Sequence, residues 1–292
     1  MSNQAHTKPV KAVSPLQETA EIFMRSWVGM TGLGLLILII AFAIFGPMIF
    51  VADPFEIVAR RSVPPGAGGP LLGTDAVGRD IFIRLVYGGS ATLTVGATAA
   101  LISICIGVTI GSLAGYFGGL VDELLMRFTE FFQVLPALLF AMVIAALFAP
   151  SLTTITISIG VVIWPATARL TRAEFLKIRK LDYVDAERVI GSGSGRIIWR
   201  VILPNALPPL VVSATLAIGL AILFEAALSF LGLGDPNRTS WGLMIGDGKT
   251  SMLSNWWAVT FPGIMIVLTV LSISMIGDGL NDALNPKLRE RR

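Results

Sequence analysis

Long stretches without a charged residue divide this chain into segments that are each long enough to cross a lipid bilayer. A helix needs about 20 apolar residues to span the hydrocarbon core. The stretch between Glu130 and Arg169 is nearly twice that length, and Pro150 divides it because proline disfavours helix at the residue before it. The pattern therefore predicts six spanning helices, at about 27–50, 89–115, 124–148, 152–171, 206–231 and 257–279.

Basic residues near the ends of the predicted spans favour one orientation across the membrane. Because the number of spans is even, the 1–26 tail, the 172–205 segment and the C-terminus fall on one side. That side is richer in Lys and Arg, although the 51–88 segment on the other side also contains arginines. We therefore expect both termini in the cytoplasm, and we expect the first apolar run to be a retained span because it is too long for a cleavable signal peptide.

Composition supports a membrane protein and excludes several other classes. Hydrophobic residues make up 54% of the chain and charged residues 14%, against about 25% charged residues in soluble domains. The single histidine, His6, and the single cysteine, Cys105, provide no disulfide, no metal-ligand cluster and no histidine-based catalysis. We expect Cys105, which lies inside an apolar run, to be a small packed core residue. The net charge of +3 follows membrane topology, so no nucleic-acid partner is expected.

The segment 51–88 contains a glycine- and proline-rich stretch followed by a short acidic and basic motif. Pro64 to Pro70 predicts an irregular surface loop. The motif after it has two interpretations, a tight turn held by an Arg–Asp pair or an external surface that receives a partner. The residues singled out in this motif are Gly73, Asp75, Gly78, Arg79 and Asp80.

The loop 172–205 between the fourth and fifth spans is the most patterned polar segment. Residues 181–190 have helix-compatible spacing, the glycine-rich run 191–195 then interrupts the helix, and a second amphipathic stretch ends at Pro204. Two short helices of this kind suit either docking of another protein or an interfacial membrane helix, and periodicity does not decide between them. The expected apolar face of the first helix comprises Val184, Ala186, Val189 and Ile190.

The spacing within this loop resembles the EAA loop of ABC importer permeases. The family pattern is Glu-Ala-Ala, three residues, Gly, nine residues, and Ile-x-Leu-Pro. The corresponding residues here are Asp185-Ala186-Glu187, Gly191 and Val201-Ile202-Leu203-Pro204, with both fixed spacings kept. The sequence departs from the pattern where Asp185 replaces the first Glu, Glu187 replaces the last Ala and Val201 replaces the Ile.

Other segments look like the C-type permease of the dipeptide/oligopeptide/nickel transport class, and together they cover about residues 27–290. These segments are 72–80, 225–234, 240–242, 256–257 and 277–286. The resemblance implies an all-α, polytopic membrane protein with six transmembrane helices and the type I ABC importer permease fold. The implied parts are a cytoplasmic tail 1–26, a first transmembrane helix 27–50, a periplasmic loop 51–88, a transmembrane core 89–282 with the coupling loop 172–205, and a cytoplasmic tail 283–292.

The resemblance also implies a function, namely half of an ATP-driven import pathway in a bacterial cytoplasmic membrane for a peptide or similar small solute. A B-type permease would form the other half, two ATPase subunits would bind ATP and Mg²⁺, and a periplasmic or lipoprotein binding protein would deliver the solute. This chain has no Gly-x-x-x-x-Gly-Lys-Ser/Thr phosphate-binding loop, so we expect no cofactor and no ATPase site in it. The ATPase-coupling residues implied by the resemblance are Tyr183, Asp185, Ala186, Glu187, Gly191, Leu203 and Pro204.

Two of these expectations leave alternatives open. Asp185 either contacts the ATPase or caps the start of a coupling helix. Glu225, in the predicted fifth span, should avoid lipid, because a charge at mid-bilayer costs about 2.5–3.5 kcal/mol on the insertion scale. It is therefore either a structural partner of a neighbouring polar group or a contact in the solute pathway.

Two other function classes compete with an ABC permease. A membrane-embedded enzyme would need a catalytic constellation, and the sequence contains no HExxH motif and no paired carboxylates within its spans. An ATP-independent secondary transporter or channel usually has functional charges in several spans, and Glu225 is the single clear case here. Co-purification with a second permease and with nucleotide-binding subunits would separate an ABC permease from both.

Overall fold

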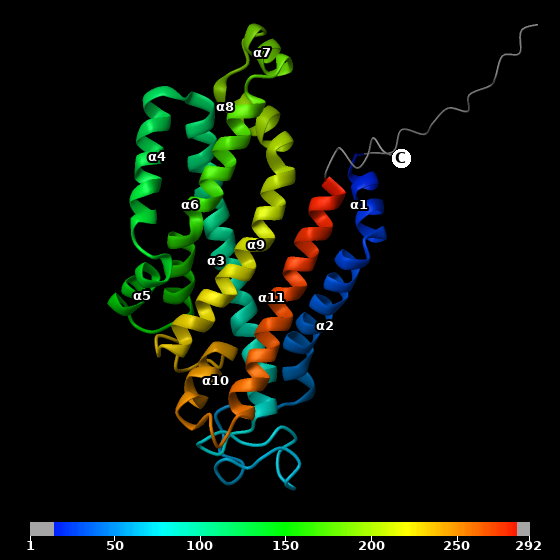
Figure 1. Ribbon diagram of the computed structural model, residues 1–292, viewed down its shortest axis with the longest axis vertical. Helices are drawn as coiled ribbons and strands as arrows, with labels where there is room; N and C mark the ends of the chain where they lie inside the picture. Colours follow the sequence, from blue (N-terminus) through cyan, green and yellow to red (C-terminus); the bar gives the residue numbers. More distant parts are fainter. Residues whose placement is uncertain (1–14, 285–292) are drawn as a thin grey trace, which may run out of the picture.

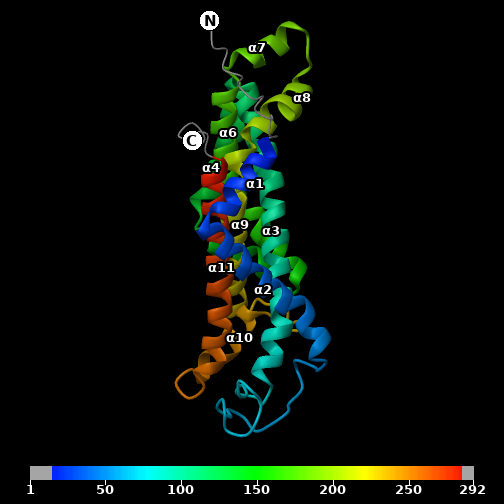
Figure 2. The same ribbon diagram turned by 90° about the vertical axis from the view of Figure 1, so that its right-hand side faces the viewer.

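The computed structural model describes residues 15–284, and every regular element in that range is a helix. The helices form an elongated bundle with α7 at one end and α10 together with the segment 51–80 at the other (Figure 1), and the turned view shows the same two ends (Figure 2). The all-α prediction is confirmed. The helices are α1 (Pro15–Arg25), α2 (Trp27–Ile49), α3 (Ile81–Phe117), α4 (Gly119–Val134), α5 (Ala137–Leu147), α6 (Leu152–Ile178), α7 (Asp182–Val189), α8 (Ser194–Arg196), a π-helix (Ile197–Ile202), α9 (Leu203–Phe230), α10 (Trp241–Gly248), a 3₁₀ turn (Lys249–Ser251) and α11 (Trp257–Leu284).

Within the described residues, five helical stretches are long and apolar enough to cross a bilayer, built on α2, α3, α6, α9 and α11. A sixth crossing exists when α4 and α5 are counted as one span, and these two helices meet at an angle of 83°. The prediction of one continuous helix at 124–148 is therefore wrong. The break lies at Pro136, which restricts the residue before it, and Leu135 adopts an extended conformation (φ −87°, ψ 140°).

Helix α3 begins at Ile81, eight residues earlier than the predicted start of the second span. Asp80 caps it, because its Oδ1 accepts hydrogen bonds from the backbone N–H of Phe82 (2.8 Å) and of Ile83 (3.4 Å). With 37 residues, α3 is about 55 Å long and extends beyond the hydrocarbon core, which is about 30 Å thick. Counting charge-free residues started the span too late because Arg84 lies inside the helix.

Glycines on α3 allow it to pack closely against α6. A Cβ atom added at Gly111 would lie 2.3 Å from the backbone oxygen of Ala168, and one added at Gly115 would lie 2.5 Å from Cβ of Phe175. Gly107, one turn before Gly111, meets α6 in the same way. Small residues at every fourth position let two membrane helices approach closely, so this contact forms the centre of the bundle.

The first span lies against the last one. Gly32 on α2 approaches α11 so closely that an added Cβ would lie 2.6 Å from Cβ of Met275. The predicted 1–26 tail contains a helix from residue 15 onward, α1, which packs against α2 and α11. Residues 1–14, with His6, and residues 285–292 of the predicted C-terminal tail lie outside the described residues.

The expectation for Cys105 is wrong. Its side chain is exposed on the surface of α3, on a face that also presents the hydroxyl residues Ser90, Thr94 and Thr109. Each of these hydroxyls donates to a carbonyl one turn back in α3, at 2.6–2.9 Å. This face is therefore compatible with a membrane or a partner chain, because no hydroxyl donor on it is left unused.

Candidate functional sites at the two ends of the bundle

The loop 172–205 forms the tip of the bundle at the α7 end (Figure 1). Helix α7 ends in a Schellman motif, in which the N–H of Ser192 bonds to the carbonyl of Glu187 (3.0 Å) and that of Gly191 to the carbonyl of Arg188 (3.0 Å). Gly191 has φ +85°, a conformation that glycine adopts without strain. Gly191 therefore ends α7 and allows the chain to turn back.

The apolar residues of α7 do not form the single face expected from the sequence. Val184 is fully buried and packs into a cluster with Phe175 of α6 and Ile197 of the π-helix. Val189 is 88% exposed and Ile190 is 77% exposed. Ala186 is exposed as well. The expected apolar face is therefore wrong. Val184 alone faces the bundle, whereas Val189 and Ile190, at the end of the helix, project from the tip.

The charged residues of α7 bond to one another within the loop. Asp185 pairs with Arg188 at 2.7 Å, and both side chains are largely exposed. The carboxylate of Glu187 accepts a hydrogen bond from the hydroxyl of Ser192, which supports the turn after the helix. Asp185 is not the cap of α7, because the helix begins at Asp182 and has no side-chain cap.

The base of the loop is continuous with α9. Leu203 is partly buried and packs against the same cluster that holds Val184, and Pro204 lies in the first turn of α9, where its missing N–H is tolerated. Tyr183, on the other side of α7, is 42% exposed. The structure thus brings the predicted loop residues onto one unit, in which Val184 and Leu203 anchor the loop and the tip is free.

Two arginines fix this unit to the long helices. Arg179, just after α6, donates from Nη1 to the carbonyls of Gly115 (2.9 Å) and Tyr116 (3.1 Å) at the C-terminus of α3. A positive charge is favourable at a helix C-terminus. Arg172 of α6 forms a two-point ion pair with Asp122 of α4, with Nη2 at 2.6 Å from Oδ2. These contacts join the end of α6, at the base of the loop, to α3 and α4.

At the opposite end of the bundle, Asp75 organises the segment 51–80. Its Oδ1 accepts hydrogen bonds from the backbone N–H groups of Val77 (2.8 Å), Gly78 (2.9 Å) and Arg79 (3.0 Å), and its Oδ2 accepts from Arg79 Nε (2.7 Å) and Arg84 Nη1 (2.8 Å). Burial raises the pKa of Asp75, but the backbone donors and both arginine charges outweigh it, so the pKa lies below the ordinary value of 3.8. Asp75 is therefore a structural anion at the centre of a turn.

Asp247 of α10 completes a four-residue network that sequence reasoning missed. Its Oδ2 lies 2.7 Å from Arg84 Nη2 and 2.9 Å from Arg79 Nη2. Arg84 is 1% exposed, so both of its carboxylate partners compensate a buried charge. In the sequence, the one sign of this network is that Arg84 lies at the edge of an apolar stretch. Asp247 is far away along the chain, so its pairing with Arg84 leaves no local pattern.

The glycines of the external motif are required by close backbone contacts. Gly73 has φ +78°, and a Cβ there would lie 2.3 Å from the oxygen of Val63. Gly78 has φ +107°, and a Cβ there would lie 2.5 Å from the oxygen of Ala59. Together with the hydrogen bonds of Asp80 at the N-terminus of α3, these contacts favour the interpretation of the motif as a tight turn held by an Arg–Asp pair. We refer to the segment 51–80 with α10 as the cap.

Glu225 of α9 is fully buried and faces the interior of the bundle. Its Oε1 accepts a hydrogen bond from Ser229 Oγ (2.8 Å), and its Oε2 accepts from Thr92 Oγ1 of α3 (3.3 Å). Thr92 Oγ1 in turn accepts from the backbone N–H of Trp241 (3.2 Å). Because these contacts join α3, α9 and the start of α10, the geometry favours the structural interpretation of Glu225.

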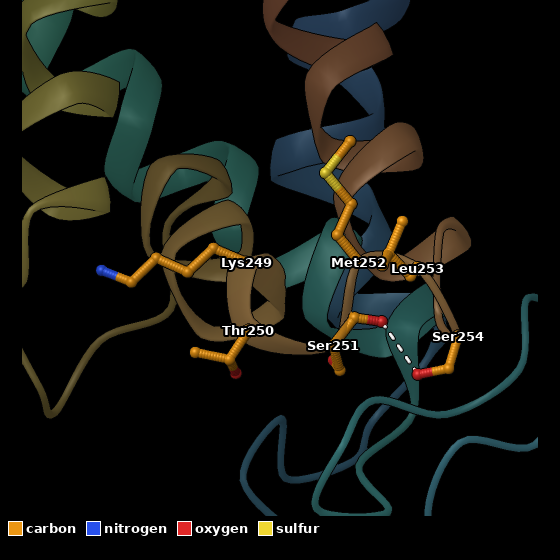
Figure 3. A pocket seen from close by; sticks show the side chains of 6 residues that line it. All are labelled: Lys249, Thr250, Ser251, Met252, Leu253 and Ser254. Atoms are coloured by element: carbon orange, nitrogen blue, oxygen red, sulfur yellow. Dashed lines mark hydrogen bonds between the residues drawn. The ribbon is translucent and has the colours of Figure 1, made fainter.

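Among residues 15–284, no group of three or more His, Cys, Asp or Glu side chains could hold a metal ion. A cleft of about 350 Å³ lies inside the turn 249–254 that joins α10 to α11 (Figure 3). Its lining consists of three hydroxyl side chains, two apolar side chains and Lys249, and Lys249 donates to the carbonyl of Phe230 rather than to one of these hydroxyls.

Comparison with known proteins identifies relatives over nearly the whole chain. The family described as "Binding-protein-dependent transport system inner membrane component" matches residues 107–290, and the "N-terminal TM domain of oligopeptide transport permease C" matches residues 14–65. The dipeptide transport system permease protein DppC of Escherichia coli is 42% identical over 300 residues, covering 99% of this chain and 100% of the relative. The di/tripeptide transport system permease protein DppC of Pseudomonas aeruginosa is 40% identical over 283 residues, covering 94% and 93%.

Solved structures support the fold. The MetNI methionine ABC transporter, crystallised in inward-facing conformations, contains a chain that superposes with a TM-score of 0.58. The sequences are 20% identical, and the superposition covers 69% of this chain and 96% of the other. A second crystal form gives a TM-score of 0.54 at 19% identity. At this identity the likeness concerns the fold alone.

Proposed function

We propose that this chain, which belongs to the family of binding-protein-dependent transport system inner membrane components, takes part in the import of short peptides. The chain is a multi-pass membrane protein and a permease subunit of an ABC importer. The single observation that carries the mechanism is the projecting tip of α7, where Val189 and Ile190 are exposed on a loop fixed to four long helices.

The proposed solute is a dipeptide or tripeptide. Relatives that match nearly the full length of this chain are named as dipeptide or di/tripeptide permeases, in Escherichia coli, Bacillus subtilis and Pseudomonas aeruginosa. Glu225 has its hydrogen bonds satisfied by Thr92 and Ser229, so we do not assign it a solute contact.

The proposed partners of the α7 end are two cytoplasmic ATPase subunits that bind ATP and Mg²⁺. Val189 and Ile190 would insert into an apolar groove of one ATPase, while Tyr183, Asp185 and Glu187 would surround the contact. Closure of the ATPase pair would then move the tip of α7, and the cluster around Val184 would pass this motion to α3, α6 and α9. This proposal places both termini in the cytoplasm, because the start of α1 and the end of α11 lie toward the α7 end (Figure 1).

The proposed partners elsewhere are a second, B-type permease and an extracytoplasmic binding protein. The second permease would cover an apolar face that this chain leaves open, and the apolar stripe on α4 fits this role, since Leu124 is 69% exposed and Phe128 is 49% exposed. Charged residues stand on the neighbouring face of the same helix, where Arg127 pairs with Glu123 at 3.3 Å. The binding protein would dock on the cap at the other end.

Transport by the assembled complex tests the proposal. Proteoliposomes that contain this chain, the second permease and the ATPase subunits should accumulate a labelled dipeptide only with ATP and the binding protein present. Omitting the ATPase subunits should abolish uptake. Uptake by this chain without any ATPase would instead establish the alternative, an ATP-independent secondary transporter or channel.

A further inference from the structure

The turn 249–256 between α10 and α11 separates its apolar and hydroxyl side chains onto opposite sides. Figure 3 shows Met252 and Leu253 directed back along α11, toward the membrane-spanning part of the bundle. The hydroxyl oxygens of Thr250, Ser251 and Ser254 lie on the other side of the turn (Figure 3). Separation of apolar from polar side chains is typical of segments that lie at a lipid surface.

The apolar side of this turn is open in the single chain. Leu253 is fully exposed, Met252 is 53% exposed and Trp256 is 54% exposed. Exposed large apolar side chains that stand together beside a spanning helix mark an interaction surface. Tryptophan is enriched at the boundary between membrane and water, where its ring is apolar and its N–H remains hydrated.

Trp256 also stands at the head of an apolar stripe on α11. The stripe continues down the helix at Ile264, Val267 and Leu271, which are 46%, 63% and 49% exposed. Spacings of three and four residues place these side chains on one face of a helix that is long enough to span the bilayer. The exposed side of the turn is thus continuous with an open apolar face of a membrane-spanning helix.

The rest of the turn is fastened to the protein, so the apolar side chains have a rigid base. Lys249 donates from Nζ to the carbonyl of Phe230 (3.0 Å) at the end of α9, with its ammonium 5.0 Å from the ring centre of Phe230. Asn255 Nδ2 donates to Ser62 Oγ (2.6 Å) in the cap. With Lys249 and Asn255 engaged, the large apolar side chains left exposed on the turn are those of Met252, Leu253 and Trp256.

From this arrangement we propose that the turn 249–256 is a membrane-interface anchor, in which Met252, Leu253 and Trp256 enter the headgroup and upper acyl region of the surrounding lipid. The anchor sets the depth of α10 and of the adjoining end of α11 in the bilayer. Its partner is a phospholipid surface, so the inference depends neither on the identity of the solute nor on the direction of transport.

Site-directed fluorescence can test the anchor in the complete transporter. The exposed Cys105 is replaced by Ala, and one cysteine is placed at Leu253 or, as a matched control in the same turn, at Thr250. Each variant carries the environment-sensitive dye NBD and is reconstituted in phosphatidylcholine nanodiscs. Brominated phosphatidylcholine then quenches a dye in lipid, and aqueous iodide quenches a dye in water.

The anchor predicts that L253C is quenched severalfold more by brominated lipid than T250C, and that iodide gives the reverse order. Equal accessibility of the two positions to both quenchers would overturn the proposal. Protection of L253C from both quenchers would also overturn it, because a protein partner would then cover the turn. Both positions are exposed, so the substitutions leave the core unchanged, and monodisperse elution of each variant checks the fold.

Discussion

Arg84 donates from Nη1 to Asp75 Oδ2 over 2.8 Å, and the arginine side chain is only 1% exposed. This ion pair joins the segment 51–80 to the first turn of α3, and Asp247 extends it to α10. A buried charge is costly without a partner, so the pair specifies one position for the cap relative to α3. The external motif of this chain therefore serves first to hold its own structure.

Replacing Asp75 with Asn should destabilise the cap. The substitution removes the carboxylate that two arginines share, and breaking a buried pair costs roughly 3–5 kcal/mol. The temperature of unfolding in detergent, or protease sensitivity of the segment 51–80, measures the loss. The matched control is Glu123→Gln, which breaks the exposed pair with Arg127 and should cost less than about 1 kcal/mol. An equal effect of the two substitutions would contradict the role of Asp75.

The stability of the cap should depend on pH through Asp75. Because its pKa is lowered in the folded protein, the carboxylate contributes stability that is complete above the ordinary value of 3.8 and is lost as pH falls through the lower, folded value. Protease sensitivity of the cap, measured as pH is lowered below 3.8, should therefore rise in the native chain. The Asp75→Asn variant should lack this additional step, and a step of the same size in both proteins would rule out Asp75 as its source.

Close packing of α3 against α6 should make Gly111 intolerant of any side chain. A Cβ at this position would lie 2.3 Å from a backbone oxygen of α6, so Gly111→Ala forces the helices apart, at a cost of roughly 1–3 kcal/mol. The matched control is Gly34→Ala in α2, where an added Cβ meets nothing within 4 Å. Thermal unfolding of both variants should show a loss only at Gly111.

Gly191 should be required for coupling and not for insertion. Its φ of +85° disfavours any residue with a side chain by about 1–2 kcal/mol, while an added Cβ would meet no neighbour within 4 Å. We expect Gly191→Val to distort the end of α7, leave membrane insertion intact and lower peptide-stimulated ATPase activity. Gly193→Ala, at negative φ and in open space, serves as the control. Loss of expression by G191V would instead assign the glycine a folding role.

The sequence predicted the all-α class, the approximate positions of five apolar spans and the loop 172–205, because each depends on local periodicity or fixed spacing. It did not predict the 83° break between α4 and α5, because counting charge-free residues gives no weight to Pro136 within a long apolar run. The ion pair of Arg84 with Asp247 could not be predicted either, since it joins residues far apart in the chain. Hydrophobicity suggested a single apolar face on α7, whereas the fold buries Val184 and leaves Val189 and Ile190 outside.

The most direct test of the coupling account replaces Val189 and Ile190 together with Asp and measures ATPase association and peptide uptake. Both side chains are exposed, so the chain should still enter the membrane and assemble with the second permease. Ile57→Asp, at a 63% exposed residue of the cap, is the control and should leave ATPase association unchanged. The account predicts that the double variant no longer retains the ATPase subunits and loses uptake. Full retention of the ATPase with normal uptake would contradict it.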